Sequence, residues 1–462
     1  LAEDERTLEE KKAVAEEVVG SVANRESERL ISANAVTVVK NENDLLPLKL
    51  DEHSRVLFAS TYSRNNNRFV LAWERAKQAG LIPEGADYKI LQHYNWTGLP
   101  DQVNSAINSD GTNFYGTNQD LLDWCTVLVH ASEISSASNI DGYRVTCPQL
   151  FINYCEGLGK DTVAISLNQP YDVQAFSEAD AIVAVYGTTS AGLDITESFG
   201  GGTVSANAAF SPNLTAGVEV ILGTFGASGK LPVDIPRYIS GTGTYSDEIV
   251  YPLGHGLSYD SLVPDPDKQA LQTAIEQAEA LDLSQFTEAS VTAAKEALDA
   301  MNEALDDAQN TMLTHKLAQS VVDESTNALN ERMDALMDLL VYDTDKSALS
   351  AAIDDAMALQ EEDYTEDTWA AFAQALADAK AVLEANVDQE QVDAALQALK
   401  DAQAALTLRG SEAPEDPQPS EGGENKPDDT ETGAATGMGL LAAAFLASAA
   451  GVLCLNRRRR TH

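Results

Sequence analysis

Residues 162–186 read TVAISLNQPYDVQAFSEADAIVAVY, and this stretch decides the fold of the first half of the chain. It contains two short apolar runs, 162–166 and 181–186. Similar runs lie at 35–39, 56–60, 126–130 and 231–235, and helical patterns lie at 68–79, 148–157 and 214–222. Short apolar strands that alternate with helices predict an α/β domain with a mostly parallel sheet and helices on both faces.

Charge excludes one class of partner. The 462 residues include 73 acidic and 30 basic side chains, a formal net charge of −43. Such a chain repels phosphate backbones, so we expect no nucleic-acid partner. The excess is largest over 267–410, with 30 acidic against 8 basic residues, which indicates a domain boundary near 267.

The cysteines and acidic residues show no metal-binding pattern. Cys125, Cys147, Cys155 and Cys454 have neither zinc spacing nor a CxxC pair. Cys147 and Cys155 could pair, but small buried hydrophobic side chains are the favoured interpretation. The acidic residues lack EF-hand spacing. We therefore predict no metal and no cofactor.

The acidic region is an internal repeat. Residues 267–268 and 286–288 recur at 345–346 and 364–366, an offset of 78, whereas the third helix realigns at an offset of 70. Apolar residues follow a 3-4-3-4 spacing in the second helix of both copies, which places them on one helix face. The sequence predicts two three-helix bundles, the second with eight fewer residues between helices two and three.

The C-terminal region predicts attachment to a membrane or cell wall. Residues 411–433 are rich in Pro, Gly, Glu and Asp, which favours a disordered stalk. Residues 434–455 are small and apolar, long enough for one transmembrane or sorting-signal helix, and four arginines follow. The arginines should stay in the cytoplasm, so everything before 434 is expected outside the cell. No N-terminal export signal precedes it, and we expect that an N-terminal portion is missing.

These observations divide the chain into seven parts. They are a helical linker (1–30), the α/β domain (31–262), two helical repeats (267–340 and 345–408), a stalk (411–433), an apolar helix (434–455) and a basic tail (456–462).

Several phrases resemble a known enzyme family. The α/β region opens with NAVTVVKN (34–41) and LLPL (45–48), and closes with GKLPV (229–233) and YPLGHGLSY (251–259). Together these resemble the C-terminal domain of glycoside hydrolase family 3. The phrase VAISLNQPYD (163–172) is similar to one in the β-N-acetylhexosaminidase branch, with Asn and Gln where Arg and Asn are usual.

The remaining parts also resemble known modules. The helical repeats resemble FIVAR modules. The tail resembles a Gram-positive cell-wall sorting signal, although Asp429 and Thr430 stand where Leu and Pro are expected.

The family resemblance implies a function that this chain does not complete. Retaining glycosidases use a nucleophilic carboxylate and a proton donor about 5 Å apart. In this family the nucleophile lies on an N-terminal (β/α)₈ barrel, and in the hexosaminidase branch the proton donor lies there too. We find neither motif, so we expect no catalytic residue in this chain and no hydrolysis by it alone. The resemblance implies that the complete protein is a secreted, surface-anchored β-N-acetylhexosaminidase. The missing barrel domain would be the partner of this chain, and the substrates would be β-linked GlcNAc-type glycans.

The resemblance also suggests residues that contact the sugar. Asn168, Tyr171 and Asp172 follow a buried strand and could reach sugar hydroxyls; the alternative is a turn in which Asp172 caps the next segment. In the β-glucosidase branch the acid/base is a glutamate of this domain, which would be Glu133; a solvated loop glutamate is the favoured interpretation. His130 is favoured as a hydrogen-bonded strand-end histidine. A third possibility is a non-catalytic surface protein whose repeats bind a ligand.

Overall fold

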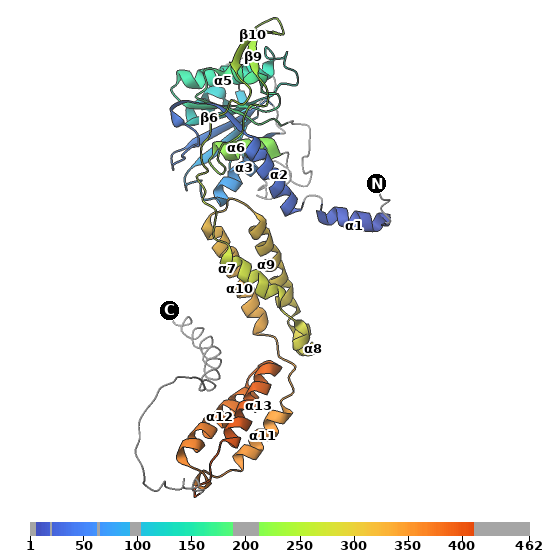
Figure 1. Cartoon of the computed structure of the whole chain (residues 1–462). Coiled ribbons are helices and arrows are strands. Elements are labelled where there is room, and N and C mark those ends of the chain that lie inside the picture. Colours follow the sequence, from blue (N-terminus) through green and yellow to red (C-terminus); the bar gives the residue numbers. More distant parts are fainter. Residues whose placement is uncertain (1–5, 19–20, 62–64, 93–102, 188–211, 411–462) are drawn as a thin grey trace, which may run out of the picture. The chain divides into compact units, whose positions relative to one another are not determined.

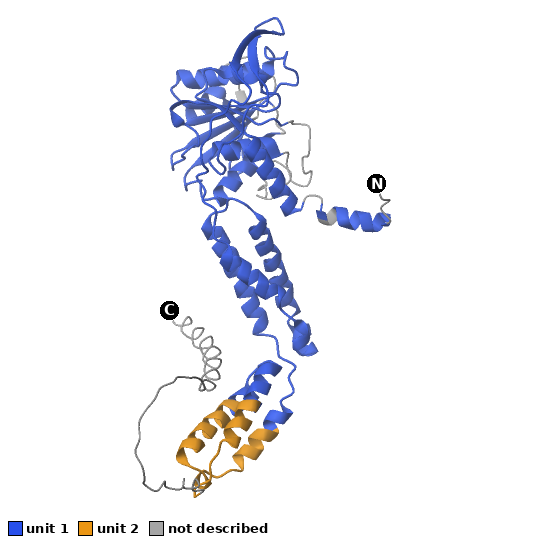
Figure 2. Ribbon diagram, in the orientation of Figure 1, with its two compact units in different colours: residues 1–350, 380–396 blue, residues 351–379, 397–462 orange. Residues whose placement is uncertain are grey.

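The computed structural model describes residues 6–18, 21–61, 65–92, 103–187 and 212–410. These described residues fall into two compact units, one within 6–350 together with 380–396 and the other 351–379 with 397–410 (Figure 2). Within the described ranges, an α/β domain precedes a helical region, as predicted (Figure 1). The predicted stalk, apolar helix and basic tail lie outside these ranges. Among the described helices, none has the length and apolar character needed to cross a membrane.

The α/β domain is built on a mixed sheet. Its described strands follow the order β1-β8-β7-β6-β2-β3-β4-β5. They are β1 (Thr37–Asn41), β2 (Arg55–Ser60), β3 (Asp87–Gln92), β4 (Val103–Asn108), β5 (Asn113–Thr117), β6 (Val127–Ser132), β7 (Asp161–Ser166) and β8 (Ala181–Ala184). The five central strands are parallel to one another: β3, β2, β6, β7 and β8. At the two sides of the sheet, β1, β4 and β5 pair antiparallel to their neighbours. The prediction of a mostly parallel sheet thus holds for its centre alone.

Side chains alternate between the two faces of the sheet, as strand geometry requires. On β2, Val56 and Phe58 join one core, and Leu57 and Ala59 join the other. The first core is covered by α2 (Val22–Ala35), α3 (Asn66–Gln78) and α6 (Pro212–Ile221). The second is covered by α4 (Asn118–Trp124), α5 (Tyr143–Gly157) and the 3₁₀ helix η3 (Pro170–Phe176). Helices therefore lie on both faces (Figure 1).

The predicted strand at 231–235 is wrong. Strand β9 (Ile235–Ile239) begins only at the last residue of the predicted range. It pairs with β10 (Thr244–Tyr251) in a separate hairpin. Gly229 and Leu231 instead contact two other segments: the Gly229 amide donates to the Val36 carbonyl just before β1 (3.2 Å), and the Leu231 amide donates to the His255 carbonyl (2.8 Å). A side chain at Gly229 would collide with the backbone of Ala35 and Val36, so this approach requires glycine.

The opening and closing phrases of the domain are in direct contact. Leu257 forms a β-bridge with Val38, and its amide donates to the Val38 carbonyl (2.8 Å). The ring Nε2 of His255 lies 2.8 Å from the Val39 carbonyl oxygen. Phrases more than 200 positions apart in sequence thus close one domain around β1.

Buried charges connect the α/β domain with the first helical repeat. Arg29 on α2 is 2 % exposed and binds the carboxylate of Glu219 on α6 (2.5 and 2.9 Å) and that of Glu26 (3.0 Å). The same guanidinium donates to the carbonyl of His315, just after the second helix of that repeat (3.0 Å). Ala318 also donates its amide to the carbonyl of Gln78 at the end of α3 (2.9 Å).

Both repeats contain three helical segments. The first consists of α7 (Gln269–Glu279), α8 (Glu288–Ala293) continued by α9 (Lys295–Leu313), and α10 (Gln319–Met337). The second consists of α11 (Ser347–Met357), α12 (Glu366–Glu384) and α13 (Gln389–Ala404). The prediction that the extra residues of the first copy lie between helices two and three is wrong. The connections, 314–318 and 385–388, are nearly equal, and the extra residues lengthen the second helix.

The repeated Asp-Lys pair has a structural role. The Lys268 ammonium donates to the carbonyls of Thr311, Met312 and Thr314, at 2.6 to 2.9 Å. Lys346 makes the same three contacts at the end of α12. Because the last carbonyls of a helix have no partner within it, a lysine there satisfies them and complements the helix dipole.

Candidate functional site at the carboxyl edge of the sheet

Asp172 joins the carboxyl ends of two neighbouring strands. Its Oδ2 accepts a hydrogen bond from Ser132, the last residue of β6 (2.6 Å), and its Oδ1 accepts one from Ser166, the last residue of β7 (2.5 Å). The two serines are paired in the sheet register. Asp172 is 0 % exposed. In this structure Asp172 therefore holds the ends of β6 and β7 together. A contact between Asp172 and a sugar stays a prediction.

Burial perturbs this carboxyl group. Loss of solvent raises the pKa of Asp172 to about 6, although the hydrogen bonds from Ser132 and Ser166 lower it. The negative charge of Glu133 raises it further. Two carboxyl groups thus influence each other at the edge where β6 and β7 end.

Glu133 directly follows β6 and is 6 % exposed, so its interpretation as a solvated loop glutamate is wrong. His130, inside β6, is 0 % exposed, and its ring lies 5.4 Å from that of Phe151 on α5. Its Nδ1 is 3.2 Å from the Ala131 carbonyl oxygen. His130 belongs to the packed interior, whereas Glu133 lies at the edge beside Asp172.

Asn168 and Tyr171 lie on the same edge and are half-buried. Asn168 comes two residues after the end of β7, and Tyr171 is the second residue of η3. The structure therefore brings Asn168, Tyr171 and Asp172 together around one strand end, with Glu133 next to Asp172. These residue types can accept and donate hydrogen bonds to a hydroxyl-rich ligand.

The carboxyl end of β2 adds polar residues that the sequence analysis missed. Asn65, before α3, donates from Nδ2 to Ser60 Oγ (2.7 Å) and accepts at Oδ1 from Arg68 (2.5 Å). Ser60, Asn65 and Arg68 are each at most 2 % exposed. Because β2 runs parallel to β6, this polar group lies at the same edge as Asp172. A serine as the last residue of β2, β6 and β7 is the signal that could have revealed it.

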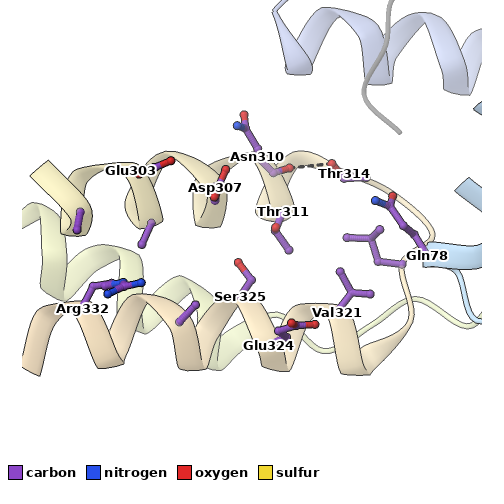
Figure 3. Close-up of a pocket in the computed structure, with 14 residues that line it drawn as sticks. Gln78, Glu303, Asp307, Asn310, Thr311, Thr314, Val321, Glu324, Ser325 and Arg332 are labelled. Carbon is purple, nitrogen blue, oxygen red and sulfur yellow. Dashed lines mark hydrogen bonds between the residues drawn. The ribbon is translucent and has the colours of Figure 1, made fainter. Parts of the chain in front are cut away.

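A groove of about 540 Å³ lies elsewhere, on the first repeat (Figure 3). Glu303 and Asp307 come from α9, Glu324 and Arg332 from α10, and Gln78 from the end of α3. The four charged residues are exposed. The groove shares no residue with the edge formed by β6 and β7. Among the residues that the structure describes, no group of His, Cys, Asp or Glu could hold a metal ion.

Comparison with known proteins identifies the helical repeats. The FIVAR domain model matches residues 267–336 and 345–407, which confirms the predicted resemblance. No curated protein matches the chain.

Solved structures similar to this chain include family 3 glycosidases. A β-glucosidase from Erythrobacter marinus has 17% identity and a TM-score of 0.29, with 50% of this chain and 34% of that chain covered. For a β-glucosidase from Listeria innocua in complex with isofagomine the values are 15%, 0.34, 56% and 36%. For a glycoside hydrolase family 3 β-N-acetylglucosaminidase from a Paenibacillus species they are 13%, 0.24, 42% and 29%. The chain thus spans about a third of the length of these enzymes.

Proposed function

We propose that the α/β domain is the accessory domain of an extracellular, surface-anchored glycoside hydrolase of the β-N-acetylhexosaminidase type. The carboxylate that attacks the sugar would lie on a barrel domain outside these 462 residues. The α/β domain would contribute its carboxyl edge, with Asn168 and Tyr171 toward substrate and Asp172 holding the strand ends. Substrates would be β-linked GlcNAc or related glycans.

The observation that carries this proposal is the gathering of the phrase 163–172 at one sheet edge. Ligands of open α/β sheets bind outside the carboxyl ends of the strands. Asp172 fixes the loop on which Asn168 and Tyr171 lie, because its two hydrogen bonds join the ends of β6 and β7. The contact between the opening and closing phrases around β1 also supports the resemblance, since the phrases that define the family domain meet in space.

The proposal predicts which forms of the protein hydrolyse a β-GlcNAc substrate. The complete gene product should release p-nitrophenol from p-nitrophenyl β-GlcNAc, and this chain alone should not. In the complete enzyme, Asn168→Ala should weaken turnover of that substrate, whereas Asn139→Ala, in an exposed loop residue after β6, serves as the control. If both variants were as active as wild type, Asn168 would not be a substrate-binding residue.

A second candidate rests on the position of Glu133. A nearly buried carboxyl group at the end of β6, influencing Asp172, fits the proton donor of a β-glucosidase. In that case Glu133→Gln should lower kcat on p-nitrophenyl β-glucose by about 10²–10⁴-fold, the usual contribution of general acid–base catalysis. In the leading proposal the same variant keeps its activity on p-nitrophenyl β-GlcNAc to within a few-fold. No hydrolysis of either substrate by the complete product would favour a non-catalytic surface protein.

A further inference from the structure

The hairpin β9–β10 brings three tyrosines together beside the candidate site. Tyr238 on β9 and Tyr245 on β10 have ring centroids 5.3 Å apart, and Tyr171 on η3 lies 5.8 Å from Tyr245. All three side chains are half-buried, so part of each stays open to solvent. We call Tyr171, Tyr238 and Tyr245 the tyrosine cluster. The cluster connects Tyr171, a candidate site residue, to the hairpin β9–β10, for which the sequence suggested no function.

The hairpin is fixed to the loop that follows β6. Asp141 accepts hydrogen bonds from Tyr238 Oη (2.7 Å), from the Gly241 amide (2.8 Å) and from Ser240 Oγ (3.2 Å). These donors, led by Tyr238, hold the pKa of Asp141 below its usual value. Tyr245 donates its hydroxyl to the carbonyl of Ala137 in the same loop.

The hairpin is also fixed to the loop that follows β7. Gln174 donates from Nε2 to the Pro236 carbonyl (2.9 Å) and accepts from the Tyr238 amide (2.6 Å). The tyrosine cluster therefore sits on both loops that leave the carboxyl ends of β6 and β7. Its rings are held before any ligand arrives, which lowers the entropic cost of binding.

The chemistry around the cluster favours a neutral, hydroxyl-rich ligand. Two of the tyrosine hydroxyls are committed to protein acceptors, which leaves their rings as the contact surface. Tyr171 donates its hydroxyl to no residue that the structure describes. The nearby charges of Asp141 and of the Arg237–Glu248 pair (2.5 Å) are already matched by protein donors and acceptors. A pyranose ring offers an apolar C–H face and a rim of hydroxyls, which suits an aromatic surface with a polar margin.

We propose that the tyrosine cluster binds a pyranose ring of an extended β-linked glycan, next to the sugar that Asn168 and Tyr171 contact. This inference rests on the proposed glycosidase function and adds a preference for longer substrates. Tyr245 supplies the central ring, Tyr238 orients it, and Tyr171 adds a free hydroxyl. Part of the saccharide-binding surface would then belong to this chain. Saccharide binding by this chain could therefore be measured in the absence of the barrel domain.

The test is isothermal titration of this 462-residue chain with the β-1,4-linked GlcNAc tetramer and the monomer. The principal variant is Tyr245→Leu, which keeps apolar volume but removes the ring. Its matched control is Tyr115→Leu, because Tyr115 on β5 is a 74 % exposed tyrosine at an edge strand of the same sheet. Tyr171→Phe removes only the hydroxyl. Circular dichroism verifies that each variant is folded.

Wild type should bind the tetramer more tightly than the monomer, and Tyr245→Leu should weaken tetramer binding about tenfold, the order expected for one aromatic contact. Tyr115→Leu should bind as wild type does, and Tyr171→Phe should weaken binding less than Tyr245→Leu. Wild-type chain that fails to bind the tetramer at millimolar concentration, or Tyr245→Leu that binds unchanged, would overturn the inference.

The complete enzyme separates this failure from failure of the proposed function. A p-nitrophenyl monosaccharide would meet only Tyr171 of the cluster, so Tyr245→Leu should lower hydrolysis of the tetramer more than hydrolysis of the monosaccharide. Loss of the tetramer preference with retained monosaccharide hydrolysis supports the cluster. Hydrolysis by wild type together with unchanged tetramer binding by the variant refutes the cluster and leaves the enzyme assignment intact.

Discussion

Replacing Asp172 with asparagine should change how the stability of the α/β domain depends on pH. Asp172 is completely buried, and its folded pKa is raised from 3.8 to about 6, chiefly by burial. Asparagine has nearly the same shape and does not titrate. It can accept from one serine and donate to the other, because the carbonyls of Ile165 and Gln169 lie 3.2 and 3.3 Å from Ser132 and Ser166 as alternative acceptors.

The sign follows from proton linkage. A group whose pKa is higher in the folded state binds its proton more tightly there, so its favourable contribution is complete below pH 4 and is lost as the pH rises through 6. A difference of just over two pKa units corresponds to about 3 kcal/mol. Because the unfolded carboxyl group is already partly ionised at pH 4, the free energy of unfolding of Asp172→Asn should increase by about 2 kcal/mol, relative to wild type, between pH 4 and pH 7.

Urea unfolding at pH 4, 5, 6 and 7 measures this difference. Tryptophan fluorescence reports on the α/β domain if both proteins carry Trp369→Phe, because the other tryptophans lie at 73, 96 and 124. Comparing the variant with wild type at each pH cancels the titration of all other groups. A stability difference that stays constant over this range would refute the assignment of a raised pKa to Asp172.

Three further outcomes follow from the fold. Arg29→Met should destabilise the α/β domain by about 3–5 kcal/mol, because it removes the cation that two buried carboxylates share, whereas Arg237→Met, in an exposed pair, should leave the urea midpoint unchanged. Lys268→Met should lower the free energy of unfolding of the first repeat by about 1–2 kcal/mol, since it removes hydrogen bonds to carbonyls, and an unchanged thermal midpoint would contradict the capping role. In a Cys454→Ser background, Ellman's reagent should label no thiol until denaturant is added, because Cys125, Cys147 and Cys155 are buried thiols that form no disulfide.

The sequence predicted the elements whose side chains are apolar on both faces. Strands β6 and β8 are buried throughout and β7 is buried after Asp161, and their continuous apolar runs are a direct signal. Strands β3, β4 and β5, which form one side of the sheet, were missed. They carry polar residues, as in NFYGT (113–117) of the edge strand β5, and therefore resemble loops in composition. The repeat offset located both bundles, but the pattern could not distinguish a longer helix from a longer connection.

The candidate site was predicted in part, and the limit is physical. The phrase 163–172 places Asn168, Tyr171 and Asp172 after one strand, so their proximity to each other follows from sequence. The partners of Asp172 do not, because Ser132 lies on another strand and only the register of β6 with β7 brings it near. The tyrosine cluster was equally hidden: Tyr238 and Tyr245 are more than 60 residues from Tyr171 in the sequence, and a hairpin fold brings them there.

Hydrolysis of p-nitrophenyl β-GlcNAc by the complete gene product, beside this 462-residue chain, tests the central claim most directly. The account predicts that the complete product releases p-nitrophenol, that it prefers β-GlcNAc to β-glucose, and that this chain alone releases none. Hydrolysis by this chain alone would contradict the claim that the nucleophile lies on another domain. Absence of hydrolysis by the complete product on both substrates would contradict the assignment to a glycoside hydrolase.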